Sequence, residues 1–224
     1  RHGRAETEKG MVMGMKYALT NAVLLDGSRD MKPQTGMSVL VDGEKIADIV
    51  PDNRIPVAYE RRDLGGRYLI PGLINMHVHL AGSGKPQKKQ RDNEKLVSTI
   101  MGSALTRAVA YKMVCGFAHD ALMSGVTTIR TVGGLGDFDT RLRDEIAAGT
   151  RVGPRILAAN RGISVPGGHM AGSVAIAAHN TEEAIAHLHA SAKEKVDLIK
   201  LMITGGVMDA KEKGVPGELK MAPE

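Results

Sequence analysis

The first part of the chain alternates short apolar runs with polar turns. Apolar runs cover residues 22–25, 37–41 and 45–50, and an Asp-Gly pair follows each of the first two. Alternating apolar residues on both sides of Asp-Gly predict β-hairpins, because glycine readily takes the positive φ of a tight turn. The unit formed by these runs is too small for a core of its own, so we expect it to need further strands from elsewhere.

From about residue 69 onward, apolar strands alternate with helical stretches. We expect strands over 69–79, 126–132, 155–160 and 197–203, and helices over 93–124, over 138–148 and from 181 onward. The continuous apolar character of the first strand predicts burial on both faces. Strands that alternate with helices indicate parallel βα units. Because Gly133–Gly136 lacks the spacing of a dinucleotide-binding loop, a (β/α)₈ barrel is favoured over a doubly wound sheet.

Composition and charge exclude several classes of function. The 224 residues carry a formal charge of +5, only 3% are aromatic and none is Trp, which argues against nucleic-acid binding by base stacking. The single cysteine, Cys115, excludes a disulfide within the chain and fits a reducing compartment, so we expect a cytoplasmic protein. No apolar run reaches the roughly 20 residues of a membrane span, and no signal sequence is visible, so no membrane partner is expected.

His77 and His79, at the end of the first strand after residue 68, are the most informative residues of the chain. Side chains two positions apart on a strand point to the same face, so the two imidazoles should project side by side. Two neutral imidazoles in that arrangement form half of a site for a divalent transition metal. The alternative is a pair of histidines that hydrogen-bond locally, and the spacing alone favours this alternative.

Other polar residues follow the ends of the later strands. Arg130 closes the second strand, His169 lies in the loop after the third, and Lys200 lies within the fourth. Because the carboxyl ends of parallel barrel strands meet at one face, we expect these side chains to converge into a site. Asp137 and Asp139, which follow the second strand, are interpreted as solvated acids of a loop.

Lys200 is of interest because its neighbours in sequence are apolar. Burial of an ammonium group is costly, and it lowers the pKa of a lysine toward a neutral, nucleophilic amine. Such an amine can form a Schiff base, or it can take up carbon dioxide and become an anionic carbamate. The alternative is a lysine whose stem packs while its charged head reaches water.

Together these motifs resemble the amidohydrolase superfamily. Ile70–His79 is similar to the first-strand signature of that superfamily. Gly125–Arg130, Gly167–His169 and Ile199–Gly206 resemble its metal-dependent prolidase and carboxypeptidase branch, to which imidazolonepropionase is related. The resemblance runs from about residue 17 to the last residue.

The resemblance implies a (β/α)₈ TIM-type barrel with a small N-terminal β-sandwich subdomain. Residues 11–68 would form part of the sandwich, and residues 69–224 would form the first four βα units of the barrel. Residues 1–10 are polar and are expected to be a disordered leader or one added for expression.

The resemblance also implies a binuclear zinc site, with Mn²⁺ or Co²⁺ as possible substitutes. His77 and His79 would bind the more buried metal, and Lys200, as a carbamate, would bridge both metals. His169 would contact the carbonyl or carboxylate of the substrate. A hydroxide that bridges the metals would attack the amide carbonyl of a small substrate, either a dipeptide such as Xaa-Pro or an N-acyl amino acid.

Two departures from the family pattern keep alternatives open. Thr131 stands where the branch usually has Asp, and the family's remaining ligands lie on the fifth, sixth and eighth strands, beyond Glu224. A chain that ended there would be inactive, and it would serve only as a structural half that pairs with a complementary chain or with itself. Further alternatives are a cyclic-amide hydrolase of the imidazolonepropionase type and a Schiff-base lyase. We expect a small-molecule or dipeptide substrate and a homo-oligomer.

Overall fold

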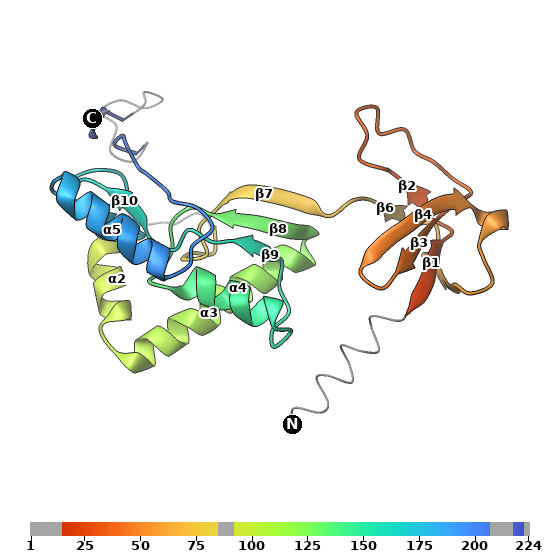
Figure 1. The fold of residues 1–224 in the computed structure, drawn as a ribbon, viewed down its shortest axis with the longest axis horizontal. Coiled ribbons are helices and arrows are strands. Elements are labelled where there is room, and N and C mark those ends of the chain that lie inside the picture. The colour runs from red at the N-terminus through yellow and green to blue at the C-terminus, as the bar shows by residue number, and fades with distance from the viewer. Residues whose placement is uncertain (1–14, 85–91, 207–216, 222–224) are drawn as a thin grey trace. The chain divides into compact units, whose positions relative to one another are not determined.

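The computed structural model describes residues 15–84, 92–206 and 217–221. The chain divides into two compact units, Arg1–Pro71 and Gly72–Glu224 (Figure 1). The leader expected over residues 1–10 lies outside the described residues.

The first unit consists of short strands. They are β1 (Lys16–Thr20), β2 (Val23–Leu24), β3 (Met37–Asp42), β4 (Lys45–Pro51), β5 (Glu60–Asp63) and β6 (Tyr68–Leu69), with a 3₁₀ turn, η1, at Asp52–Arg54. Four of them form a sheet in the order β4-β3-β1-β5, and β2 pairs with β6 in parallel. Ala18, Val39 and Leu40 are the buried apolar residues of the four-stranded sheet.

One of the two hairpin predictions is confirmed. β3 and β4 pair antiparallel around Asp42-Gly43, and Gly43 has a φ of +60°. The hairpin predicted at Asp26-Gly27 is wrong, because the chain returns to pair with Leu24 only at Gln34. Asp26 instead accepts hydrogen bonds from the Ser28 backbone and the Gln34 side chain, which holds a wider loop.

The second unit is built on a parallel sheet. The strands β7 (Leu73–Val78), β8 (Val126–Thr131) and β9 (Arg155–Leu157) lie side by side in that order. The helices are α2 (Asn93–Met101), α3 (Ala104–Met123), α4 (Phe138–Ala147) and α5 (Thr181–Lys193). α3 packs against β8 and α4 against β9, and the two helices also contact each other (Figure 1). The predicted parallel βα units are therefore present.

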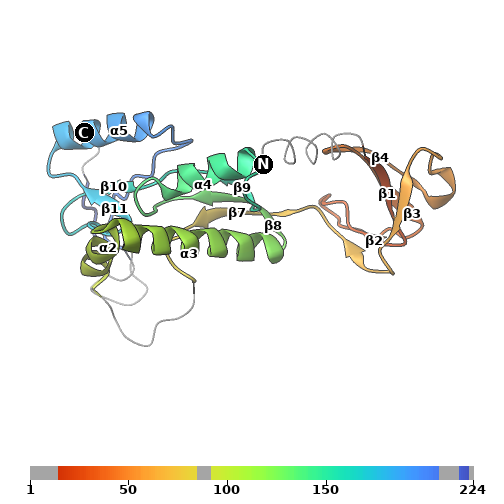
Figure 2. The same cartoon turned by 90° about the horizontal axis from the view of Figure 1, so that it is seen from below.

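A small parallel pair of strands follows the sheet. β10 (Gly162–Ser164) and β11 (Ala175–Ala177) pair within the stretch that carries the glycine-rich loop. The pair lies at the same end of the unit as α2 and α5 (Figure 2). None of the helices in the described parts of the chain is long and apolar enough to cross a membrane.

The prediction that the first barrel strand is buried on both faces is wrong. Leu73, Ile74 and Met76 are 50%, 64% and 44% exposed. Among the described strands, β7 pairs only with β8, so it is the edge of its sheet. The apolar composition of β7 predicts burial, but the described residues leave several of its side chains exposed to solvent.

The fourth strand, predicted over residues 197–203, is reduced to a single bridge between Leu201 and Ile163. The Ile163 backbone N–H donates to the Lys200 carbonyl, and the Met202 N–H donates to the Ile163 carbonyl. Farther back, the carboxylate of Asp197 accepts the hydrogen bond from the Ala158 N–H. The Asp197 backbone N–H donates in turn to the Ala158 carbonyl at 2.8 Å. The segment therefore runs beside its neighbour through scattered bonds, with one parallel bridge at Leu201 and no regular strand.

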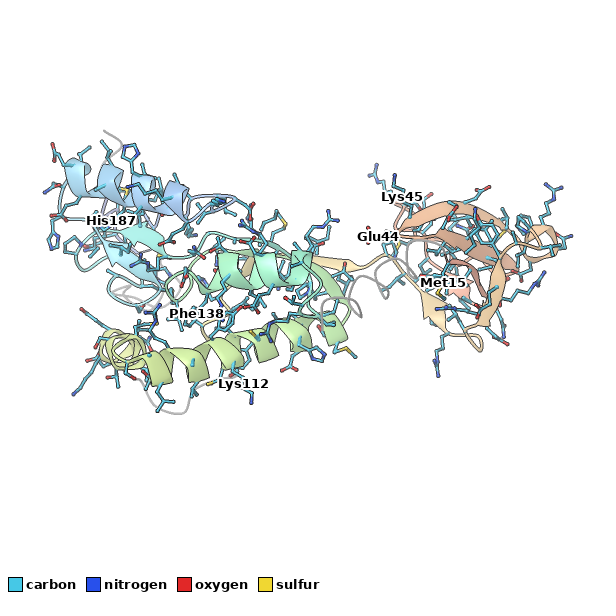
Figure 3. All side chains as sticks on the ribbon, turned by 60° about the horizontal axis from the view of Figure 1, so that its bottom comes forward. Met15, Glu44, Lys45, Lys112, Phe138 and His187 are labelled. Carbon is cyan, nitrogen blue, oxygen red and sulfur yellow. The ribbon has the colours of Figure 1, made fainter. Side chains whose placement is uncertain are left out.

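The core of the second unit lies between the sheet and its helices. The fully buried side chains Ile129 and Leu142 come from β8 and α4. Phe138 stands at the start of α4 (Figure 3). Its ring meets that of Tyr111 of α3 edge to face, with the ring centroids 5.2 Å apart. This packing joins α3 and α4 over the sheet.

The helix predicted over residues 93–124 is two helices. α2 ends at Met101, and Gly102 is its C-cap. The Ser103 hydroxyl then caps α3 by accepting a hydrogen bond from the Thr106 N–H at 3.2 Å. Serine competes well for this position because its oxygen satisfies one of the unpaired N–H groups of a helix start.

Replacing Ser103 by alanine is expected to lower the free energy of unfolding by about 1 kcal/mol, because the Thr106 N–H loses its partner. Urea unfolding followed by circular dichroism measures this change. Ser98→Ala is the matched control, since Ser98 is an exposed residue inside α2 that caps no helix. An equal loss in both variants would contradict a capping role for Ser103.

Candidate metal centre

The two histidines stand at the carboxyl end of β7. His77 belongs to the strand, and His79 lies one residue beyond it. Their Nε2 atoms are 3.2 Å apart, and their ring centroids are 5.2 Å apart. The imidazoles therefore project side by side, as the alternation of side chains along a strand predicts.

The far nitrogen of His79 is held by the backbone of the loop after β8. Its Nδ1 lies 3.0 Å from the Gly133 carbonyl oxygen. A carbonyl oxygen can only accept, so Nδ1 carries the hydrogen and donates it, which leaves the Nε2 lone pair facing His77. Gly133 has a φ of +142°, and a Cβ there would come within 3.1 Å of the ring, so glycine is required for this approach.

The spacing of the pair fits a tetrahedral zinc ion. Zn–N bonds of about 2.0–2.1 Å at a tetrahedral angle place two imidazole nitrogens about 3.3 Å apart. The separation between the Nε2 atoms of His77 and His79 is 3.2 Å. A backbone carbonyl that orients a ligating imidazole is also a common second contact of metal-binding histidines.

The electrostatics of His77 show which charges surround it. His77 is an exposed residue, yet partial loss of water around its ring is the largest influence and lowers its pKa. Lys200 and Arg130 lower the pKa further by their positive charge, as do His79 and His169 when they are protonated. The neutral imidazole, which is the form that binds metal, is thereby favoured. The residues predicted to converge at one face from the ends of separate strands are thus close enough to act on one another.

Arg130 and Lys200 are positioned by backbone contacts. Arg130 Nε donates to the Met76 carbonyl at 2.8 Å, which ties β8 to β7 just before the histidine pair. Lys200 is half-buried, and its sequence neighbours Ile199 and Leu201 are exposed. Lys200 is thus neither fully buried nor fully exposed, and its partial burial leaves open both alternatives, a buried amine and a lysine whose stem packs while its head reaches water.

His169 lies where two loops meet. Its backbone N–H donates to the Thr204 carbonyl at 3.4 Å. Its imidazole packs directly against Gly206, where any side chain would overlap the ring. The glycine-rich loop after β10 is thus joined to the segment that follows Lys200.

A group of three or more His, Cys, Asp or Glu side chains arranged to hold a metal is not found in the described stretches of the chain. His77 and His79 are a pair of candidate ligands whose nitrogen atoms approach each other. A cavity of about 480 Å³ adjoins both histidines and extends toward Asp120 and Ser124 of the α3 end. It provides open volume beside the imidazoles.

The interpretation of Asp139 as a solvated acid of a loop is wrong, because the structure buries its side chain. It is 1% exposed, and neither carboxylate oxygen has a hydrogen-bond partner of good geometry. Burial raises its pKa to about 6, although the nearby Thr131 hydroxyl and Asn160 N–H act in the opposite direction. The carboxylate packs against Gly134, where a Cβ would lie 2.6 Å from an oxygen. No local sequence signal distinguishes it from the exposed Asp137.

Residues 68–218 match the profile of the Amidohydrolase family, which is more than half of the chain. The chain belongs to the amidohydrolase family. Members of this superfamily generally bind divalent metals and share a fold of the TIM-barrel type, so the parallel βα units and the histidine pair have a common explanation.

Relatives of this amidohydrolase chain include imidazolonepropionase from Streptomyces avermitilis, which is 29% identical over 110 residues, or 44% of this chain and 26% of the relative. Among solved structures, a protein assigned as a prolidase from Bifidobacterium longum has a TM-score of 0.67 at 32% identity, over 89% of this chain and 44% of its own. A Xaa-Pro dipeptidase with bound methionine has a TM-score of 0.68 at 28% identity, over 90% and 50%. The chain thus spans half or less of the length of these relatives.

Proposed function

We propose that the protein is a metal-dependent hydrolase that cleaves the amide bond of a dipeptide such as Xaa-Pro or of an N-acyl amino acid. The observation that carries this proposal is the 3.2 Å approach of the His77 and His79 Nε2 atoms, with His79 oriented by the Gly133 carbonyl. The likeness to a prolidase and to a Xaa-Pro dipeptidase supports the choice of substrate. In this proposal the fold is completed as a (β/α)₈ barrel with a β-sandwich.

In the proposed site, His77 and His79 hold a divalent ion, zinc in the first instance. Lys200 contributes as a carbamate, whose anionic oxygens would balance the positive charge that the described residues gather around His77. A bound divalent metal supplies a Lewis acid and lowers the pKa of water toward neutrality. His169 stands at the meeting of two loops, where it orients the carbonyl or carboxylate of the substrate.

The net reaction adds water across the C–N bond of the amide and yields a carboxylic acid and an amine. Arg130 links β8 to β7 beside the pair through its bond to the Met76 carbonyl, at the point where the pairing of the two strands is irregular. Its positive charge lowers the pKa of His77 and so favours the neutral imidazole, which is the form that binds a metal.

The proposal is tested by assaying the protein for hydrolysis of Xaa-Pro dipeptides and N-acetyl amino acids. We expect turnover that disappears after treatment with a chelator and returns with zinc, manganese or cobalt. The absence of both bound metal and turnover would overturn the proposal and favour a purely structural role.

A second candidate function is opening of a cyclic amide, which the similarity to imidazolonepropionase supports. Including imidazolonepropionate among the substrates separates the two. Metal-dependent turnover of this compound with no dipeptide hydrolysis would select the second candidate.

The carbamate on Lys200 is tested by native mass spectrometry. We expect a mass increase of about 44 Da, that of one carbon dioxide, in bicarbonate buffer at pH 8, where the free amine needed for carbamate formation is more available. The increase is expected to be absent from Lys200→Met and retained in Lys193→Met, a control in the last turn of α5. An unchanged mass in the parent protein would remove the carbamate from the proposal.

A further inference from the structure

A second cavity, of about 290 Å³, lies beside His79. Its walls come from α2, from the loops after β7 and β8 and from the loop between β10 and β11. The apolar side chains that line it are Leu96, Val97, Ile100, Leu135, Met170 and Val174. Its volume is at the lower limit of small-molecule pockets, about 300 Å³.

The inner wall of this cavity is fixed by the core and by the metal centre. Leu135 and Val174 belong to the buried cluster of the unit. Gly133 separates His79 from Val174, and a Cβ at Gly133 would lie within 3.1 Å of the imidazole and 3.2 Å of the valine. The cavity therefore begins directly behind the ring that presents Nε2 to the metal position.

Met170, which follows His169 in the chain, lines the cavity, and its backbone is held in an unusual conformation. It has a φ of +54°, which L-residues other than glycine, asparagine and aspartate rarely adopt. Its carbonyl accepts hydrogen bonds from the Ser173 N–H and hydroxyl and from the Ala175 N–H. Backbone strain that its surroundings hold in place is concentrated at ligand-binding sites. The thioether side chain is also well suited to adapt to an apolar ligand.

None of the described residues that line the cavity is charged, and the polar ones are few, chiefly His79, Asn93 and Ser173. A charged group placed among Leu96, Ile100 and Met170 would lose water without gaining a partner, which is strongly unfavourable. An aliphatic or phenyl group would instead gain the free energy of leaving water. The chemistry of the walls thus selects for apolar groups.

We propose that this cavity receives an apolar side chain of the amide substrate, such as that of leucine, methionine or phenylalanine, while the amide lies at the metal centre. This inference rests on the proposed function, and it narrows the substrates to those with an apolar residue beside the cleaved bond. His79 connects the two sites, because one edge of its ring faces His77 and its body borders the cavity.

The test uses reduced-amide analogues of Leu-Pro and Asp-Pro, in which a methylene replaces the carbonyl, so that binding is measured without hydrolysis. We expect the leucine analogue to bind to the zinc-supplemented protein at least tenfold more tightly than the aspartate analogue. We also expect it to shift the methyl resonances of Met170 and Ile100 in the NMR spectrum. Equal affinities, no binding of either analogue, or shifts elsewhere in the protein would overturn the inference.

Leu96→Arg places a charge in the cavity wall at a position that is 42% exposed, so the fold should tolerate it. We expect the preference for the leucine analogue to fall below twofold. Leu188→Arg is the matched control, because Leu188 is a helical residue of similar exposure, 37%, on α5 and does not line the cavity. Loss of the preference in both variants, or in neither, would also overturn the inference.

Dipeptide turnover is measured separately, so that the two ideas can fail independently. Selective binding of the leucine analogue without hydrolysis of any dipeptide would leave the apolar pocket in place and overturn the hydrolase proposal. Hydrolysis of Leu-Pro and Asp-Pro with equal kcat/KM would support the hydrolase and overturn the pocket.

Discussion

Replacing His79 by alanine is expected to lower the affinity of the protein for zinc at least hundredfold and to abolish metal-dependent hydrolysis. His79 supplies one of the two imidazole nitrogens of the proposed site, and its orientation is fixed by the Gly133 carbonyl. Even residues that only orient a metal ligand change affinity by about 10–100-fold, so loss of a ligand itself should do more. Isothermal titration with zinc and the metal content of the purified variant measure this effect.

His189→Ala is the matched control for this experiment. His189 is an exposed histidine of α5, two residues from His187 on a helix, where side chains two apart do not share a face. We expect its zinc affinity to equal that of the parent protein. A His79→Ala variant that binds zinc as tightly as the parent would show that the pair is joined only by a local hydrogen bond.

His77→Ala should have the same effect on zinc binding as His79→Ala, because one imidazole alone is a weak ligand. Gly133→Ala gives an intermediate case, since the added methyl would press on the His79 ring without removing it. A graded loss of affinity from Gly133→Ala to His79→Ala would show that ring orientation, as well as ligand identity, matters at this site.

Replacing Asp139 by asparagine is expected to stabilise the folded protein by about 2–3 kcal/mol at pH 7.5. The carboxylate is almost wholly buried without a good hydrogen-bond partner, and burial raises its pKa from 3.8 to about 6. Each unit of pKa difference between the folded and unfolded states corresponds to about 1.4 kcal/mol. Asparagine has nearly the same shape and carries no charge, so the cost of burying the ionised group disappears.

The pH dependence of this effect has a definite sign. Because the pKa of Asp139 is higher in the folded protein than in the unfolded chain, the folded protein holds the proton between pH 3.8 and about 6 while the unfolded chain releases it. The stability of the parent protein therefore falls as the pH rises through this window and is level above it. The advantage of Asp139→Asn should shrink to about 1 kcal/mol at pH 4.5.

Urea unfolding of the parent and variant proteins at pH 4.5 and 7.5 measures both the size and the direction of this change. Asp137→Asn is the control, because Asp137 is exposed two residues away and its side chain makes no capping bond. We expect it to change the free energy of unfolding by less than about 0.5 kcal/mol at either pH. A destabilised Asp139→Asn variant at pH 7.5 would mean that the ionised carboxylate has a partner that stabilises it.

Several features followed from the sequence because they depend on local geometry. The alternation of strands and helices after residue 68, the β3–β4 hairpin at Asp42-Gly43 and the common face of His77 and His79 all follow from backbone periodicity and turn chemistry. The direction of the segment around Leu201, parallel to β10, also agreed with the expected βα units.

Other features were decided by packing between segments far apart in the chain. β7 is apolar in composition, but several of its side chains are exposed on the faces of the sheet, and among the described strands it pairs only with β8. The strand predicted around Lys200 is reduced to one bridge, at Leu201, and at Asp197 the side chain as well as the backbone bonds to Ala158. Asp139 and Asp137 look alike in the sequence, yet one is buried and the other exposed.

The sequence by itself determined the order of the elements and the residue types that can bind a metal, since these depend on neighbours along the chain. Only the tertiary structure brought Gly133 to His79 and placed Lys200, Arg130 and His169 near enough to lower the pKa of His77. The reason is that burial and electrostatic interaction depend on distance and surrounding medium, which are set by contacts between residues dozens of positions apart.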